Sequence, residues 1–291
     1  MKRFVFPMAF IIVLLNSSLS EALSIMRLKD VYTYNVGSVK VSMLSERQGR
    51  GNTDILIGAT PEMIAKIAPD KEYPNAINIF LVQTGVENIL VDTGFGLKLE
   101  EHLKHFKLEP KDIHSVLITH MHRDHIGGLL KDGKQRFPNA KVYLDKNEYA
   151  YWMDDPQRKA SVEHVVNAYK DKLHLFTAGD LNGKSQKLFP EVSAIAAYGH
   201  TPGHTVYMIE SKGEKLLIWG DLTHAMAFQM PYPKVSVTYD VSSSKAAQTR
   251  EQILRYVSEN KISVAGMHIA FPGMGKVSSD AKGGYIFKPL P

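Results

Sequence analysis

Residues 118–130 read ITHMHRDHIGGLL, and this stretch determines how the rest of the chain is interpreted. The apolar residues at its start predict the end of a strand. Alternation along an extended backbone then sends the side chains of His120 and His122 to the same side. Asp124 and His125 follow after the chain turns, so they can address a point beside that pair.

The residue types in this stretch are those of metal ligands. Imidazole nitrogens and carboxylate oxygens suit zinc, iron or manganese better than calcium or magnesium, which prefer shells of oxygen alone. Two neighbouring histidines are more often surface residues or hydrogen-bonded core groups. Three histidines and an aspartate within six positions at a strand end favour a metal site over a polar turn. Gly127 and Gly128, which follow, let backbone segments pack closely there.

Short apolar runs alternate with helical patterns along the rest of the chain. A hairpin is predicted over residues 31–44, where two alternating runs flank NVGS. Further strands are predicted at 78–85, 88–94, 114–120, 140–145, 193–199, 204–211, 214–221 and 261–268, and helices at 96–106, 146–155, 161–173 and 242–260. The serines that open the last helix can cap its free amides. The pattern predicts an α/β fold with sheets inside and helices outside.

Residues 46–75 interrupt this alternation. The segment is rich in glycine, proline and charged residues and contains one short helical candidate, at 60–68. We expect it to form a long excursion that covers a site.

The N-terminus has the pattern of a secretory signal peptide, which we assign to residues 1–23, with a single domain over residues 24–291. Lys2 and Arg3 precede an apolar run at 4–15, and small residues follow. The run is too short to cross a bilayer, although an uncleaved anchor is the alternative. We therefore expect a periplasmic or secreted protein with no stable membrane insertion after cleavage.

Composition argues against other classes of protein. The chain has no cysteine, so an exported form cannot rely on disulfides. Its formal charge of +5 is scattered and forms no basic stripe interleaved with aromatic residues. We therefore expect no nucleic-acid partner.

The motif THMHRDHIGG (119–128) resembles the H-x-H-x-D-H signature of the metallo-β-lactamase superfamily, and further blocks resemble its other motifs in order. These blocks are ILVDTG (89–94), YGHTPGHT (198–205), LIWGD (217–221) and VAGMH (264–268). The resemblance spans roughly residue 30 to the end of the chain. It implies a four-layer αβ/βα sandwich.

The resemblance also implies a set of metal ligands. One divalent ion would be held by His120, His122 and His200, a second by Asp124, His125 and His268, and Asp221 would bridge them. Zinc is our first choice for both ions because it is borderline-soft and redox-inert, although manganese, cobalt and iron use the same ligands.

Three other residues have supporting or catalytic assignments. Asp92, in the ILVDTG block, is expected to organise the metal-binding loop without being a ligand. His204 is expected either to orient the neighbourhood of His200 or to have a plain structural role. His224 could reach the substrate or a proton, and is therefore a catalytic candidate together with Asp124 and Asp221; its alternative is a hydrogen-bonded supporting role. The remaining histidines (His102, His105, His114, His164 and His174) are interpreted as surface residues.

A pair of divalent ions about 3.5–4 Å apart can produce a bridging hydroxide nucleophile near neutral pH. The predicted function is therefore a dinuclear metal-dependent hydrolase of lactone, ester or organophosphate triester bonds. An iron-dependent oxidoreductase of the same fold, similar to sulfur dioxygenases, is the first alternative. A non-catalytic binding protein is the second.

Two stretches, residues 219–251 and 268–289, look similar to the exported branch that includes methyl parathion hydrolase, with lactonases nearby. By analogy with that branch, Trp152, Phe228 and Phe271 are candidates for an apolar pocket wall, and the alternative is that they are core aromatics. Such a wall suits an uncharged small-molecule ester, lactone or triester better than a charged phosphate monoester. Related proteins commonly dimerise, so a homodimer is an expectation that nothing in the sequence tests.

Overall fold

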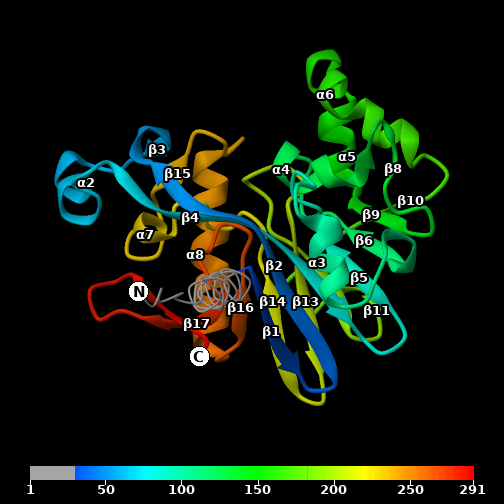
Figure 1. Cartoon of the computed structure of the whole chain (residues 1–291). Coiled ribbons are helices and arrows are strands. Elements are labelled where there is room, and N and C mark those ends of the chain that lie inside the picture. The colour runs from blue at the N-terminus through cyan, green and yellow to red at the C-terminus, as the bar shows by residue number, and fades with distance from the viewer. Residues whose placement is uncertain (1–29, 182) are drawn as a thin grey trace, which may run out of the picture.

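The computed structural model describes residues 30–181 and 183–291, and the predicted signal peptide lies outside these residues. Two seven-stranded sheets make up the centre of the molecule, with helices around them (Figure 1). The first sheet has the strand order β1 (Val31–Val36), β2 (Val39–Asn52), β4 (Glu72–Gln83), β5 (Asn88–Val91), β6 (Ser115–Leu117), β9 (Lys141–Asp145) and β10 (Leu173–Phe176). Its first strands are antiparallel, as the hairpin predicted at 31–44 requires, and β5, β6, β9 and β10 are parallel.

The second sheet is mainly antiparallel. Its order is β11 (Gln186–Phe189), β12 (Val192–Ala196), β13 (Thr205–Ser211), β14 (Glu214–Ile218), β16 (Ser263–Ala265), β17 (Met274–Ser279) and β18 (Tyr285–Pro289). Only the pair β14–β16 is parallel. The sequence reading ended the strand pattern at 261–268, and the structure adds the closing hairpin β17–β18, whose alternation is weak because many of its side chains are exposed.

Within the described residues, seven helices and three short 3-10 helices connect the strands. The helices are α2 (Pro61–Ile67), α3 (Leu99–His105), α4 (Arg123–Ile126), α5 (Lys146–Met153), α6 (Pro156–Ala168), α7 (Met226–Gln229) and α8 (Ser243–Glu259), and the 3-10 helices are η1 (Thr53–Ile55), η2 (Pro110–Asp112) and η3 (Gly127–Leu129). Asp145 and Asp155 cap α5 and α6 by accepting backbone N–H groups. The capping predicted for the opening serines of α8 is wrong for the N-cap residue, since the Ser242 side chain makes no cap hydrogen bond.

Three apolar cores define the layers. Met43 and Phe80 of the first sheet pack with Tyr207 and Ile218 of the second in a core between the two sheets. A second core lies under α3 and α6 on the outer face of the first sheet. A third joins the outer face of the second sheet to α8. The order helix, sheet, sheet, helix confirms the predicted four-layer αβ/βα sandwich. Each fully buried Leu, Ile or Phe contributes about 1.5–3 kcal/mol by leaving water.

The predicted excursion over residues 46–75 is smaller than expected. β2 continues to Asn52 and β4 begins at Glu72, so both ends of the segment are paired strands. Their pairing carries the chain out to a side lobe that contains α2 and α7 (Figure 1). The lobe also holds the small sheet of β3 (Leu56–Ile57) and β15 (Ser236–Val237); a second small sheet pairs β7 (Leu130–Lys131) with β8 (Lys134–Gln135). Charge and glycine did not prevent strand formation here, because the end of β2 is largely exposed and its backbone pairs with β4 up to Asn52.

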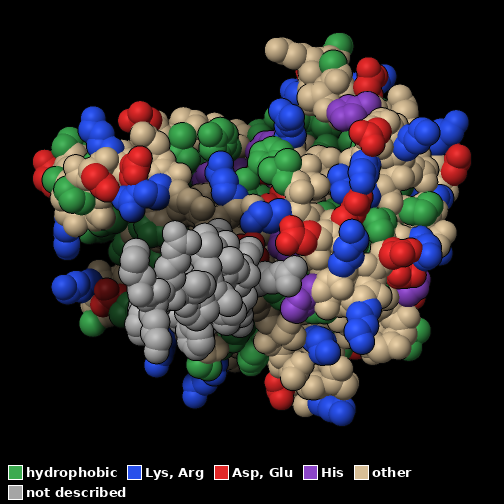
Figure 2. All heavy atoms as spheres, viewed as in Figure 1, with side chains coloured by type: hydrophobic (Ala, Val, Ile, Leu, Met, Phe, Trp, Pro, Cys, Tyr) green, Lys and Arg blue, Asp and Glu red, His purple; other side chains and the backbone are tan. Residues whose placement is uncertain are grey.

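Basic and acidic side chains are intermingled on the face seen in Figure 2, without a continuous basic band. This agrees with the scattered charge of the sequence. Among the described residues, no helix is long and apolar enough to cross a membrane.

His102 corrects one of the surface assignments. It lies on α3 with only 4% of its surface exposed, and its Nδ1 has no hydrogen-bond partner in the described structure. Burial lowers the pKa of His102 from 6.5 to about 4, because the charged form is poorly solvated there.

We predict that His102 makes the fold sensitive to acid. Because its pKa is lower in the folded than in the unfolded state, the unfolded chain takes up the proton first. Stability is therefore lost as the pH falls from 6.5 towards 4, by up to about 3 kcal/mol. Between pH 7 and pH 4.5, the free energy of unfolding measured with urea should fall less for His102→Leu than for the parent chain. His105→Leu, an exposed position on the same helix, is the control. Identical pH dependence of the His102→Leu variant and the parent would contradict this role.

Candidate metal centre

All seven predicted ligands converge at one edge of the two sheets, where several strands end. Each of the segments that supply them follows a strand: β6 precedes the first motif, β12 precedes the third, and β14 and β16 precede the last two. Ligand atoms group as His120, His122, His200 and Asp221 in one cluster, and as Asp124, His125 and His268 in another, with each cluster's atoms within 4.8 Å of one another.

Three imidazole nitrogens form a compact triangle in the first cluster. His120 Nε2 lies 2.9 Å from His122 Nδ1, and His200 Nε2 lies 3.1 Å from each of them. A tetrahedral ion bound at about 2.0–2.1 Å separates its ligand atoms by about 3.3–3.4 Å. The triangle therefore has nearly the size that a divalent zinc-like ion requires.

The second cluster is slightly wider. Asp124 Oδ2 lies 3.7 Å from His125 Nε2 and 3.6 Å from His268 Nε2. Both histidines are almost fully buried, whereas the side chain of Asp124 is 23% exposed. This cluster is therefore open to the pocket on the side of Asp124.

Asp221 lies between the two clusters. Its Oδ2 is 3.4 Å from His200 Nε2 and 3.0 Å from His268 Nε2, while its Oδ1 is 3.2 Å from His125 Nε2. Among the described residues, neither Asp221 Oδ1 nor His125 Nε2 has a hydrogen-bond partner, although both atoms are buried. Unpartnered buried polar atoms are costly, and a bound cation would satisfy both. The donor set therefore fits divalent metal ions.

The electrostatics of the cluster also favour cations. Burial alone would raise the pKa of Asp221, but His268, His125 and His120 lower it well below its ordinary value. Burial lowers the pKa of His125, yet the carboxylates of Asp221, Asp124 and Asp92 outweigh that effect and raise it well above its ordinary value. Concentrated carboxylate charge around a buried imidazole is a field that attracts positive ions.

The rings of the ligand histidines are fixed from behind. His125 Nδ1 lies 2.6 Å from Asp92 Oδ2, His200 Nδ1 lies 2.8 Å from Asp240 Oδ1, and His268 Nδ1 lies 2.8 Å from the carbonyl of Ala76. Because these oxygens accept, Nδ1 carries the proton in each ring and Nε2 is free to bind a metal.

Asp92 is hydrogen-bonded to the histidine motif. It adopts a positive φ of 58° and accepts hydrogen bonds from Thr119 N and Thr119 Oγ1, at 2.8 and 2.7 Å, in addition to its contact with His125. It is absent from the ligand clusters. Asp92 thus links the end of β5 to the start of the histidine motif.

His204 holds Asp221 and also closes the loop that carries His200. Its Nδ1 donates to the carbonyl of Ala197 at 3.0 Å, and its Nε2 accepts from Asp221 N at 3.0 Å. Burial lowers the pKa of His204 to about 3, which keeps the ring neutral and able to accept. Gly220 adopts a φ of +55°, and a Cβ there would lie 2.5 Å from His204 Nε2. This close approach therefore requires glycine.

Sequence reasoning missed Asp240 and Arg250. Asp240 lies in a loop before α8, and its second oxygen is 3.6 Å from the guanidinium of Arg250. Arg250 is 1% exposed and donates to the carbonyls of Leu222, Pro233 and Val235. An isolated aspartate in a loop has no local pattern that marks it as a partner of His200.

Glu148 was also missed. It is fully buried on α5, and its carboxylate accepts from Met121 N, Trp152 Nε1, Thr201 Oγ1 and Gly203 N, at 2.6–3.0 Å. It therefore ties the first histidine motif to the loop that carries His200.

A pocket of about 380 Å³ opens on the clusters. It is lined by Arg47, Asn75, Ile77, Phe95, His122, Asp124, Asp221, His224, Tyr239 and His268. The ring of His224 lies 4.0 Å from that of His268, and its buried Nδ1 has no hydrogen-bond partner among the described residues. His224 thus lines the pocket, and its catalytic assignment stays a prediction.

The three nominated aromatic residues do not line this pocket. Phe228 is fully buried and packs edge-on against Tyr73 in the core of the side lobe, so it is a core aromatic. Phe271 is 37% exposed and packs against Tyr32. Trp152 borders a neighbouring cavity of about 560 Å³, where its ring meets the edge of His122. The pocket wall is consequently more polar than an aromatic lining would make it.

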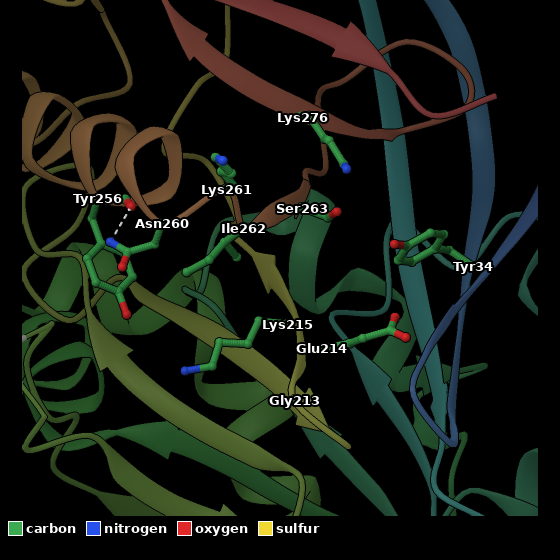
Figure 3. A pocket seen from close by; sticks show the side chains of 10 residues that line it. All are labelled: Tyr34, Gly213, Glu214, Lys215, Tyr256, Asn260, Lys261, Ile262, Ser263 and Lys276. Carbon is green, nitrogen blue, oxygen red and sulfur yellow. Dashed lines mark hydrogen bonds between the residues drawn. The ribbon is translucent and has the colours of Figure 1, made fainter.

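A separate cavity of about 340 Å³ lies away from these clusters, between β14, β16 and the end of α8 (Figure 3). Lys215, Lys261 and Lys276 contribute to its wall, and Glu214 is its one carboxylate. Its lining contains no histidine, so it lacks the imidazole donors of the two ligand clusters.

Comparison with known proteins identifies the family. Residues 73–260 match the model of the metallo-beta-lactamase superfamily, and the chain belongs to that family. It is 30% identical over 200 residues to an atrochrysone carboxyl ACP thioesterase from Aspergillus chevalieri, which covers 67% of this chain and 63% of that protein. The chain thus spans a little under two thirds of the length of that relative.

Two solved structures have closely similar folds. The hydrolase AbOPH of the beta lactamase superfamily has a TM-score of 0.81 and 27% identity, and the match covers 90% of this chain and 98% of that one. AidC, a dizinc quorum-quenching lactonase in complex with a product, has a TM-score of 0.80 and 25% identity over 90% of this chain and 97% of its own. The family therefore has lactonase neighbours of known structure, and this chain carries its His/Asp cluster.

We predict that Asp240→Asn weakens metal binding without removing a ligand. The amide cannot supply the negative charge that strengthens His200 as a donor, so affinity should fall about 10- to 100-fold. Competition with a chromophoric zinc chelator measures the change. Asp145→Asn is the matched control, because Asp145 is a buried acid that contacts no ligand side chain and accepts from Asn147 N, Ala178 N and the Tyr198 hydroxyl. Unchanged zinc affinity in Asp240→Asn would show that the contact with His200 does not tune the ligand.

Proposed function

We propose that the protein is a dinuclear metal-dependent hydrolase of lactone and carboxylic ester bonds. Organophosphate triesters are proposed as further substrates, in keeping with the resemblance to the methyl parathion hydrolase-like branch. The observation that carries the proposal is the position of Asp221, whose carboxylate contacts both clusters: Oδ2 lies 3.4 Å from His200 Nε2 of the first, and the carboxylate also meets His268 Nε2 and His125 Nε2 of the second. A carboxylate between two such groups is suited to bridge two ions.

The comparisons support this proposal at the level of the reaction. AidC is described as a dizinc lactonase, and the relative from Aspergillus chevalieri is described as a thioesterase. Lactones, esters and thioesters are all acyl compounds that water can cleave at an uncharged carbonyl. Zinc is the metal we propose. A triangle of three imidazole nitrogens of this size, with a carboxylate beside it, suits zinc.

Divalent ions bound at the clusters would acidify a water molecule and polarise the bond under attack. The residues of the chain supply the rest. His204 and Gly220 fix the backbone of Asp221, so its carboxylate keeps its position between the clusters. His224 lines the pocket, and we propose that its ring moves a proton to or from the leaving group.

The two cavities beside the clusters fit a substrate with two unlike parts. They share His122, and the wall of the neighbouring cavity includes Met121, Ile126, Trp152 and Val162, whereas the lining of the first mixes charged and polar residues with apolar ones. An ester or lactone has an acyl side and an alcohol side that could occupy the two spaces. This arrangement supports an ester-type substrate over a small symmetric one.

The N-terminal pattern of residues 1–23 supports a further proposal, that the mature protein acts in the periplasm or outside the cell.

We predict that Asp221→Asn lowers kcat/KM for a lactone and for an aryl ester by at least about a hundredfold, because a neutral amide cannot hold two cations together. Zinc bound per chain, measured by elemental analysis after gel filtration, should also fall. The test uses the zinc-loaded chain, with Asp145→Asn as the control for a lost buried charge. Retained turnover in Asp221→Asn would contradict the bridging role. Iron as the single bound metal, together with oxygen uptake, would favour an oxidoreductase instead.

A further inference from the structure

A β-bulge interrupts the pairing of β2 with β4 beside the metal-site pocket. The two strands pair Ser45 with Asn78 and then Arg47 with Ile77, so Glu46 is an extra residue without a partner. Side chains on a strand alternate between its two faces. One extra residue therefore moves every side chain beyond it to the opposite face.

The bulge determines where Arg47 points. Before it, Met43 packs in the core between the sheets, while Leu44 packs with its partner Ile79 in the core under the outer helices. Regular alternation would put Arg47 on the same face as Met43. With the bulge, Arg47 shares the face of its partner Ile77, and both residues line the pocket at the metal clusters.

The extra residue is itself anchored. Glu46 is 4% exposed, and its carboxylate accepts from Phe95 N and Leu97 N, both at 2.7 Å. A Cβ at Gly94 would overlap this carboxylate. The bulge is thus held by a buried acid, and the same bonds fix Phe95, which also lines the pocket.

The guanidinium of Arg47 is not neutralised by the described part of the chain, in which it makes no ion pair or side-chain hydrogen bond. Arg50, three positions along the same strand, shows the contrast: it pairs with Asp70 at 2.5 Å and with Glu72 at 2.6 Å. Arg47 therefore brings an unpaired positive charge to the wall of a pocket of about 380 Å³.

We propose that Arg47 forms a subsite for a carboxylate that the substrate carries away from the bond to be cleaved. This inference rests on the proposed hydrolase function. A guanidinium offers paired N–H donors in a plane, which match the two oxygens of a carboxylate. The positive charge of two divalent ions at the clusters would exceed the negative charge of Asp124 and Asp221. The clusters would then attract an anion in addition to Arg47. The preferred substrates are then esters or lactones with an acidic substituent, and not the wholly uncharged ones expected from an apolar wall.

The test compares two esters that differ in one charge. Glutaric acid monophenyl ester carries a free carboxylate, and its methyl-capped form is neutral; phenol release is followed for both with the zinc-loaded protein. Arg47→Gln should lower kcat/KM for the acid about 10- to 100-fold, mainly through KM, and change the capped ester by less than about twofold. Arg47→Lys keeps the charge but loses the planar pair of donors, so its kcat/KM for the acid should lie between the values of the parent and of Arg47→Gln.

Arg50→Gln is the matched control, because it removes an exposed arginine from the same strand outside the pocket lining. It should leave the ratio of the two kcat/KM values unchanged. An equal loss for both esters in Arg47→Gln, or a parent protein that does not prefer the acid, would overturn the subsite.

A binding measurement separates this inference from the proposed function. If the zinc-loaded protein hydrolyses neither ester, the ester hydrolase proposal fails, and the subsite is then tested by calorimetric titration with glutarate alone. Binding at least tenfold weaker in Arg47→Gln, with Arg50→Gln unchanged, supports the subsite. Equal glutarate affinity in all three proteins overturns it.

Discussion

The carboxylate of Asp221, buried among imidazoles, is the constraint on which the rest of this structure depends. A buried charge is tolerated only where opposite charges and hydrogen bonds surround it. Here both of its oxygens face ring nitrogens of His125, His200 and His268. Its backbone N–H is bonded to His204, and the sharp turn at Gly220 makes that contact possible. Any fold that contains this carboxylate must bring all of these segments to one place.

The sandwich meets this requirement through its central core. His120, His122, Asp124 and His125 follow β6 of the first sheet, whereas Asp221 and His268 follow β14 and β16 of the second. The two groups meet only because the apolar faces of the sheets pack against each other. Several contacts then cross the junction: Tyr207 donates to the carbonyl of Ile118 at 2.7 Å, and Asn78 donates to that of Ile269 at 2.7 Å. Hydrophobic burial and polar contacts between sheets thus serve the same alignment.

The sequence was most informative where function concentrates residues locally. Four ligand-type residues within six positions predicted a metal site, and the resemblance of the short blocks around Asp92, His200, Asp221 and His268 to metallo-β-lactamase motifs implied the rest of the cluster. Alternating apolar runs predicted sheets inside and helices outside. It was least informative where a contact joins distant segments. Asp240 and Glu148 are single acids without a local pattern, and they became recognisable only once the fold placed them beside His200 and Met121.

For aromatic residues, closeness in the sequence to a ligand did not predict a place in the pocket. Phe228 lies seven positions after Asp221, yet the turn of α7 directs it into the side lobe and away from the pocket. Arg47 escaped notice because it lies in the segment 46–75, which the sequence pattern predicted as an excursion and not as a strand. The bulge that directs Arg47 to the pocket depends on Glu46 contacting the amides of a loop some fifty positions away in the chain.

That bulge has a consequence for how such a chain can diverge. Position 47 can exchange one side chain for another while the backbone stays as it is, so recognition can be altered by point substitutions. The number of residues between 45 and 47 is not free in the same way. Removing Glu46 would turn every later side chain of β2 over and at once release the amides of Phe95 and Leu97. New specificity along this strand can therefore arise by substitution at position 47. An insertion or deletion between residues 45 and 47 would instead disrupt the strand.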